Sequence, residues 1–132
     1  MEELGMERCR RIVDFVTGTA AADGGSPVAV AVCDREGSLV ALQKMDGTPT
    51  RVAYLARRKA YTAARMQAAT GDFQARLARE QLDIRWFCDE RLTPLPGGAP
   101  IFSGDGRVIG SVGISGRPSA DDQELANRAA LK

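Results

Sequence analysis

Histidine is absent from this 132-residue chain, and cysteine and aromatic residues are scarce. Without an imidazole the chain lacks the usual general base and the commonest ligand of zinc and haem iron, and Ser-His-Asp and Cys-His catalytic arrangements are excluded. The three cysteines, Cys9, Cys33 and Cys88, include no CxxC pair, so buried reduced thiols are expected and no metal site is predicted. Any chemistry must therefore use carboxylates, lysine, tyrosine, cysteine or a bound cofactor.

A charge excess and long apolar runs are also missing. The formal net charge is +1 at pH 7 and 44% of residues are hydrophobic, which is typical of one soluble globular domain over residues 1–132 and gives no reason to expect a nucleic-acid partner. No apolar run reaches transmembrane length, and residues 1–11 are too charged for a secretory signal. We therefore expect no membrane partner and a cytoplasmic location.

Apolar periodicity and turn residues predict a mixed α/β chain in the order helix, hairpin, helix, short helix, hairpin, helix. Gly18 is expected to end the first helix, and Ser119 with Asp122 to form a capping box. Residues 82–100 are expected to form a long ordered loop or a lid, with Trp86 as an anchor for it rather than a stacking platform, although the sequence does not separate these two roles. The predicted helices cover 1–18, a basic segment within 45–68, 73–81 and 119 onward, and the strands cover 28–33, 39–45, 101–103 and 107–115. Two such hairpins can merge into one antiparallel sheet with helices against it.

Lys59 is an anomaly on the basic helix, because its position falls on the apolar face. One explanation is structural: the stem lies on apolar surface with the ammonium at the rim, or the ammonium pairs with a carboxylate. The other is functional: the ammonium lines a pocket and holds an anionic group. Both remain open at the level of sequence.

The opposite flank of the same helix carries an Arg/Tyr stripe, spaced by four, three and four residues. Such a stripe can contact a partner subunit, solvent or a planar acidic ligand, and its distance from the Lys59 face favours the first two. Its members are Tyr54, Arg58, Tyr61 and Arg65.

Six motifs resemble, in order and spacing, the GlcG/HbpS-like proteins and the related C-terminal part of PduO proteins, over nearly the whole chain. The motifs are Val28-Ala29-Val30-Ala31-Val32-Cys33-Asp34, Lys44-Met45-Asp46-Gly47, Arg58-Lys59-Ala60-Tyr61-Thr62-Ala63, Gly97-Gly98-Ala99-Pro100, residues 108–116 and Asp122-Gln123-Glu124. The resemblance implies a profilin-like α/β (α+β) fold, with about five antiparallel strands flanked by helices. It also implies homo-oligomers, dimers or higher, and haem or cobalamin as possible cofactors.

The resemblance places a ligand site near Lys59 and the glycine-rich second hairpin, where an ammonium, glycine amides and a hydroxyl would suit an anionic ligand. The family positions taken as ligand-binding are Met45, Asp46, Gly47, Lys59, Thr62, Gly97, Gly98, Gly113, Ser115 and Gly116. Histidine ligation of haem iron is excluded, so an iron ligand would have to come from Met45, Cys33, Tyr54 or Tyr61.

Three functions follow as hypotheses. The first is a non-catalytic module that binds a small molecule, either a tetrapyrrole (haem or corrinoid) or an organic acid. The second is an enzyme acting on a small carboxylated metabolite, with Lys59 orienting substrate and Asp46 or Glu124 moving protons. The third is an oligomeric scaffold that assists a metabolic enzyme through the Arg/Tyr stripe.

Overall fold

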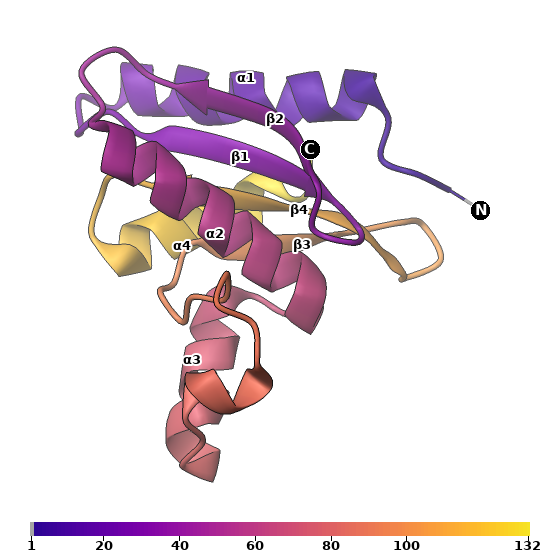
Figure 1. Cartoon of the computed structure of the whole chain (residues 1–132). Helices are drawn as coiled ribbons and strands as arrows, with labels where there is room; N and C mark the ends of the chain where they lie inside the picture. The colour runs from indigo at the N-terminus through magenta and orange to yellow at the C-terminus, as the bar shows by residue number, and fades with distance from the viewer. Residues whose placement is uncertain (1) are drawn as a thin grey trace.

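The computed structural model, which describes residues 2–132, is built on one four-stranded antiparallel sheet (Figure 1). The elements are α1 (Met6–Ala22), β1 (Ala29–Asp34), β2 (Leu39–Lys44), α2 (Thr50–Met66), α3 (Thr70–Glu80), a 3₁₀ turn η1 (Ile84–Phe87), β3 (Gly98–Phe102), β4 (Val108–Ser115) and α4 (Ser119–Ala129). None of the helices within residues 2–132 is long and apolar enough to cross a membrane.

The two hairpins merge into one antiparallel sheet, as the sequence predicted, and the structure shows that they do so through the pairing of β1 with β4. The strand order is β2-β1-β4-β3, and Ala31 lies opposite Gly113 in the central pair. The residues described contain four strands in this sheet rather than the expected five. The second hairpin is also longer than predicted, because β3 already begins at Gly98 and pairs there with Gly113.

The sheet has two covered faces of different character (Figure 1). Branched residues of β1 and β4 pack against α1 and α4, and α1 contributes Ile12 and Val16 to this core. The other face is lined by small residues such as Ala29 and Ala31, and it packs against α2. Small side chains let a helix approach a sheet closely, so α2 packs at a short distance from this face of the sheet.

Two local expectations at helix ends are wrong. Gly18 does not end α1, which continues to Ala22, because a single glycine costs only about 1 kcal/mol inside a helix whose other side is packed. Ser119 starts α4, but no side chain caps that helix. Asp122 instead accepts a hydrogen bond from the Arg117 amide at 3.2 Å and turns its second oxygen into the core.

The third wrong expectation concerns Trp86, which is 67% exposed and does not pin the loop down. Phe87 is the anchor: its ring meets Phe73 of α3 edge to face, with centroids 5.4 Å apart. Together α3 and η1 form an arm that projects from the body of the domain (Figure 1). We call residues 70–92 the arm.

Candidate functional site

Lys59 is buried in a closed ion pair. Its ammonium donates to the Ile114 carbonyl at 2.9 Å and to Asp122 Oδ2 at 3.1 Å, and the two side chains are 2% and 1% exposed. Burial lowers the pKa of Lys59 and raises the pKa of Asp122, and their mutual attraction opposes both shifts. Of the two explanations for Lys59, the pairing with a carboxylate is the one present in the structure, and the pair ties α2 to β4 and α4.

Three of the glycines predicted to bind ligand lie where the backbone of α2 comes very close to the sheet. A Cβ at Gly113 would lie 2.1 Å from the Ala56 carbonyl oxygen, and one at Gly98 would lie 2.3 Å from the Lys59 carbonyl oxygen. Gly97 has φ +135°, and a Cβ there would lie 2.8 Å from Lys59 Nζ. These glycines therefore allow α2 to contact the sheet and leave room for the buried ammonium.

The other predicted ligand-binding residues lie in two places. Thr62 and Ser115 are buried, and the Thr62 hydroxyl donates to the Arg58 carbonyl at 2.8 Å and accepts from the Thr93 amide at 2.9 Å. Gly116, with φ +131°, approaches the Pro27 carbonyl. The turn containing Met45, Asp46 and Gly47 follows β2, with the last two exposed.

The buried polar side-chain atoms around Lys59 already form hydrogen bonds with other residues of the protein. No buried side-chain nitrogen or oxygen in residues 2–132 lacks a hydrogen bond. Ligand binding at Lys59 therefore stays a prediction, and it requires the pair with Asp122 to open.

The three catalytic candidates are likewise unconnected by hydrogen bonds: Lys59 bonds only to Ile114 and Asp122, whereas Asp46 and Glu124 are exposed.

Gln123 has a structural role that sequence reasoning did not single out. Its carbonyl oxygen accepts from the Gly71 and Gly97 amides, each at 2.9 Å, and its amide nitrogen donates to the Gly98 carbonyl at 2.9 Å. One side chain thus connects α4 with the start of α3 and with the edge strand β3. The position of Gln123 inside the Asp-Gln-Glu motif was the only signal available in the sequence.

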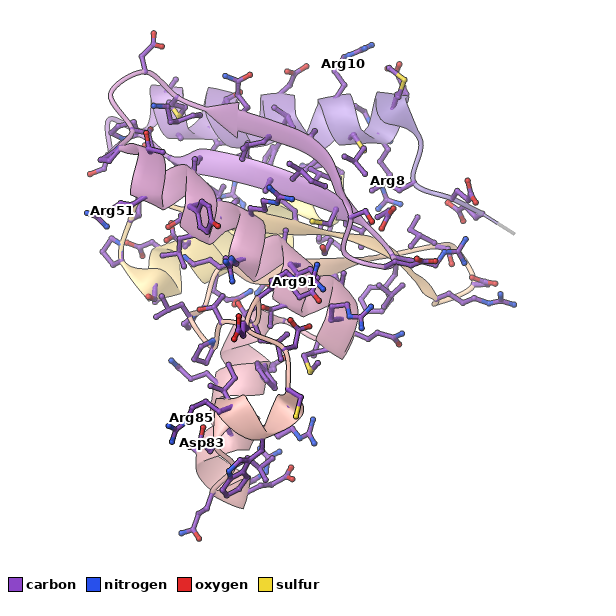
Figure 2. The ribbon with its side chains drawn as sticks, viewed as in Figure 1. Arg8, Arg10, Arg51, Asp83, Arg85 and Arg91 are labelled. Carbon is purple, nitrogen blue, oxygen red and sulfur yellow. The ribbon has the colours of Figure 1, made fainter. Side chains whose placement is uncertain are left out.

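Only part of the Arg/Tyr stripe faces solvent. Tyr61 is buried and its hydroxyl donates to Asp89 Oδ2 at 2.5 Å, while Arg58 donates to the Glu90 carbonyl at 2.9 Å. The guanidinium of Arg91 lies 4.3 Å from the centroid of the Tyr61 ring (Figure 2). Much of the stripe therefore holds residues 89–91 against α2, which is a role that helical periodicity alone does not predict.

Of the four side chains considered as iron ligands, three are enclosed or engaged. Cys33 is buried in the core, Tyr61 is bonded to Asp89, and Met45 Sδ accepts from the Val28 amide at 3.4 Å. Tyr54 is different: it is 60% exposed, and its hydroxyl oxygen accepts from Arg58 at 3.4 Å. Arg58 lowers the pKa of the Tyr54 phenol, because a guanidinium favours the phenolate form.

Tyr54 lies in a shallow cleft of about 680 Å³ over the first half of α2. Most of its wall is apolar, and guanidinium groups stand at its ends; Figure 2 shows Arg51 at the N-terminal end of α2. Arg51 forms no ion pair with another residue of the described chain. The lining residues are Thr50, Arg51, Tyr54, Leu55 and Arg58.

A larger cleft of about 810 Å³ lies at the other end of α2, next to the arm. Its wall carries Arg35, Arg65 and Arg91, but also Glu36 and Asp89 among its carboxylates. Because charges of both signs line it and Arg91 is paired with Asp89 at 3.5 Å, this cleft suits an apolar macrocycle less well than the Tyr54 cleft does.

Comparison with known proteins agrees with this fold. A family model described as "Haem degrading protein HbpS-like" matches residues 4–131. Protein GlcG of Escherichia coli K12 is 36% identical over 88 residues, which are 67% of this chain and 63% of GlcG, so the match spans less than two thirds of that relative.

Solved structures resemble the whole chain. A double mutant of HbpS from Streptomyces reticuli superposes with a TM-score of 0.87 at 27% identity, covering 99% of this chain and 87% of that one. A crystal structure of a PduOC:Heme complex superposes with a TM-score of 0.85 at 22% identity, covering 98% of this chain and 94% of that one, and at that identity it supports the fold alone. As the sequence motifs predicted, the chain belongs to the HbpS-like family.

Proposed function

We propose that this protein binds a tetrapyrrole, haem in the first instance, in the cleft over the first half of α2. The observation that carries the proposal is Tyr54: an exposed phenol whose oxygen is bonded to Arg58, set in a largely apolar cleft. Tyrosine is an established axial ligand of haem iron, and a neighbouring guanidinium favours the phenolate that ligation needs. The family to which the chain belongs, described as "Haem degrading protein HbpS-like", supports haem as the ligand.

The residues of the cleft fit the chemistry of this cofactor. When bound, haem supplies an iron that takes an axial ligand, a flat apolar macrocycle and two propionates. Tyr54 would hold the iron, Leu55 would contact the macrocycle, and Arg51 would pair with a propionate. The low polarity of the wall favours a tetrapyrrole over a small organic acid, because a small acid would cover little of it.

The test is a haem titration of the metal-free protein followed by absorption spectroscopy. Wild type should give a tyrosinate-to-iron charge-transfer band, and Tyr54→Phe should abolish it and weaken binding by about tenfold or more. The band should grow as pH rises through the lowered pKa of Tyr54, and in Arg58→Gln this rise should move to higher pH.

The chain offers a matched control, since it has only two tyrosines. Tyr61→Phe removes the other phenol, which is bonded to Asp89, and should leave the band unchanged. If Tyr54→Phe keeps the wild-type spectrum and affinity, the proposed site is wrong. Cobalamin, titrated in the same way, tests the corrinoid alternative.

A further inference from the structure

The two edges of the sheet differ in whether their outward backbone groups already have partners. On β3, the Gly98 amide donates to Thr70 Oγ1 at 2.8 Å. Pro100 has no amide hydrogen to offer, and the Phe102 carbonyl accepts from the Arg8 guanidinium at 3.3 Å. These three devices close the β3 edge to a further strand.

The β2 edge is open by comparison. The Met45 amide bonds to the Val28 carbonyl at 3.1 Å, so by the alternation of an antiparallel ladder the backbone groups of Leu42 and Lys44 point away from β1. Within residues 2–132, the one hydrogen bond that reaches these outward groups joins the exposed Gln43 side chain to the Lys44 carbonyl, at 3.2 Å. Two amides and one carbonyl therefore remain available to a strand laid alongside β2.

A groove of about 240 Å³ lies between this edge and α1. Its walls are mainly apolar, and three of the side chains that line it, Met6, Val40 and Leu42, are 73%, 45% and 44% exposed. A strand added to β2 directs every second side chain to the α1 face of the sheet, so apolar residues at alternate positions would fill the groove. The lining residues are Met6, Cys9, Arg10, Val13 and residues 40–43.

The charges along this edge are of one sign. The groove is lined by one charged side chain, Arg10, and by no carboxylate. Arg10 extends outward from α1 (Figure 2), and Lys44 is exposed at the end of β2. Neither forms an ion pair within residues 2–132. An acidic segment would supply the missing partners, whereas a second copy of β2 brings another lysine and no acid.

We propose that the β2 edge binds an extended segment of a partner protein, in which apolar residues alternate with acidic ones. The segment bonds to the outward backbone groups of Leu42 and Lys44, its apolar side chains fill the groove, and its carboxylates pair with Arg10 and Lys44. The Tyr54 cleft shares no residue with this groove, so the inference does not depend on the proposed function.

The probe is a fluorescein-labelled peptide of eight residues that alternates glutamate and valine, titrated with the full chain and followed by fluorescence anisotropy. The same peptide with lysine in place of glutamate should bind at least about tenfold more weakly. Arg10→Glu should weaken binding of the acidic peptide by about tenfold. Arg11→Glu is the matched control, since Arg11 is an exposed neighbour outside the groove, and it should bind nearly as wild type does.

Two variants of Leu42 separate backbone pairing from side-chain contact. Leu42→Pro and Leu42→Ala both lose the leucine side chain, but only proline removes the outward amide, and such a position on an edge strand tolerates proline. Leu42→Pro should therefore bind about three- to tenfold more weakly than Leu42→Ala. Circular dichroism checks the fold of both variants, and the Arg10 and Arg11 variants decide the question if Leu42→Pro does not fold.

Amide chemical-shift mapping with the acidic peptide should give the largest changes in residues 6–13 and 40–44. Absence of binding, equal affinity for the lysine peptide, or changes confined to other residues would overturn the inference. Equal affinities of Leu42→Pro and Leu42→Ala would show that the segment does not join the sheet. A sedimenting dimer that excludes the peptide and is lost in Leu42→Pro would also overturn it, because the occupant of the edge would then be a second copy of this chain.

Discussion

At the scale of single residues, Lys59 explains why a charge can occupy the apolar face of a helix. Asp122, the only buried carboxylate within residues 2–132, lies within hydrogen-bonding distance of the ammonium, and the Ile114 carbonyl accepts a second hydrogen bond. Neither charge is stable there without the other, since burial penalises both. Lys59 and Asp122 are 63 residues apart, so helical periodicity identified the anomaly but not its partner.

Lys59→Met should therefore destabilise the fold by about 3–5 kcal/mol, because it leaves Asp122 charged, buried and unpaired. Urea unfolding monitored by circular dichroism measures the loss. The double variant Lys59→Met/Asp122→Asn should regain part of it, and Arg57→Met, on the exposed neighbour, should change little. A Lys59→Met protein as stable as wild type but unable to take up ligand would contradict this account and support the site predicted from the sequence.

Gly113 is a second position where one residue type is required. Gly113→Ala would place a Cβ against the Ala56 carbonyl and the Ala60 amide, and backbone atoms cannot move aside cheaply. We expect the free energy of unfolding to fall by about 1–3 kcal/mol or more, which would be measured as a lower urea midpoint. Gly104→Ala is the control, since a Cβ at Gly104 meets nothing within 4 Å. Equal midpoints for the two variants would show that α2 does not pack as described.

At the scale of elements, Gln123 connects three segments that are far apart in the sequence. Gln123→Leu removes the acceptor of the Gly71 and Gly97 amides and the donor to the Gly98 carbonyl. Leaving these groups without hydrogen-bond partners should lower the free energy of unfolding by at least about 2 kcal/mol and accelerate amide hydrogen exchange at Gly71 and Gly97.

Asn127→Ala supplies the comparison for Gln123. Asn127 is an exposed partner of the same amide, at 2.9 Å, and its loss should leave exchange at Gly71 and Gly97 nearly unchanged. If exchange at those amides is equally slow in Gln123→Leu, then the start of α3 is held by other contacts.

The elements themselves were largely predictable, because apolar residues recur at the helical spacing in α1 and α2 and as a continuous run in β1. The errors arose where tertiary packing overrides local preference. Gly18 stays helical because α1 is packed on the sheet. At Gly98, β3 passes so close to α2 that only a glycine fits, and Asp122 lies in the core because it pairs with Lys59.

At the scale of the whole molecule, surface features depend on which side chains the fold leaves uncovered. The sequence placed Tyr54 and Tyr61 on one stripe, but residues 89–91 fold back over Tyr61 and leave Tyr54 in an open cleft. Trp86 was expected to anchor the loop, yet Phe87 is the residue that packs against Phe73, and Trp86 stays exposed. Neither outcome follows from periodicity, because both depend on the path of the loop after α3.

The central claim is that the ligand occupies the Tyr54 cleft and not the buried Lys59 region. Amide chemical-shift mapping with gallium protoporphyrin, a diamagnetic haem analogue, tests it most directly. We predict that the shifted amides cluster in residues 50–58, with little change at Lys59, Gly97, Gly98 and Ser115. Shifts concentrated at Lys59 and the glycine-rich hairpin, with residues 50–55 unaffected, would contradict the account.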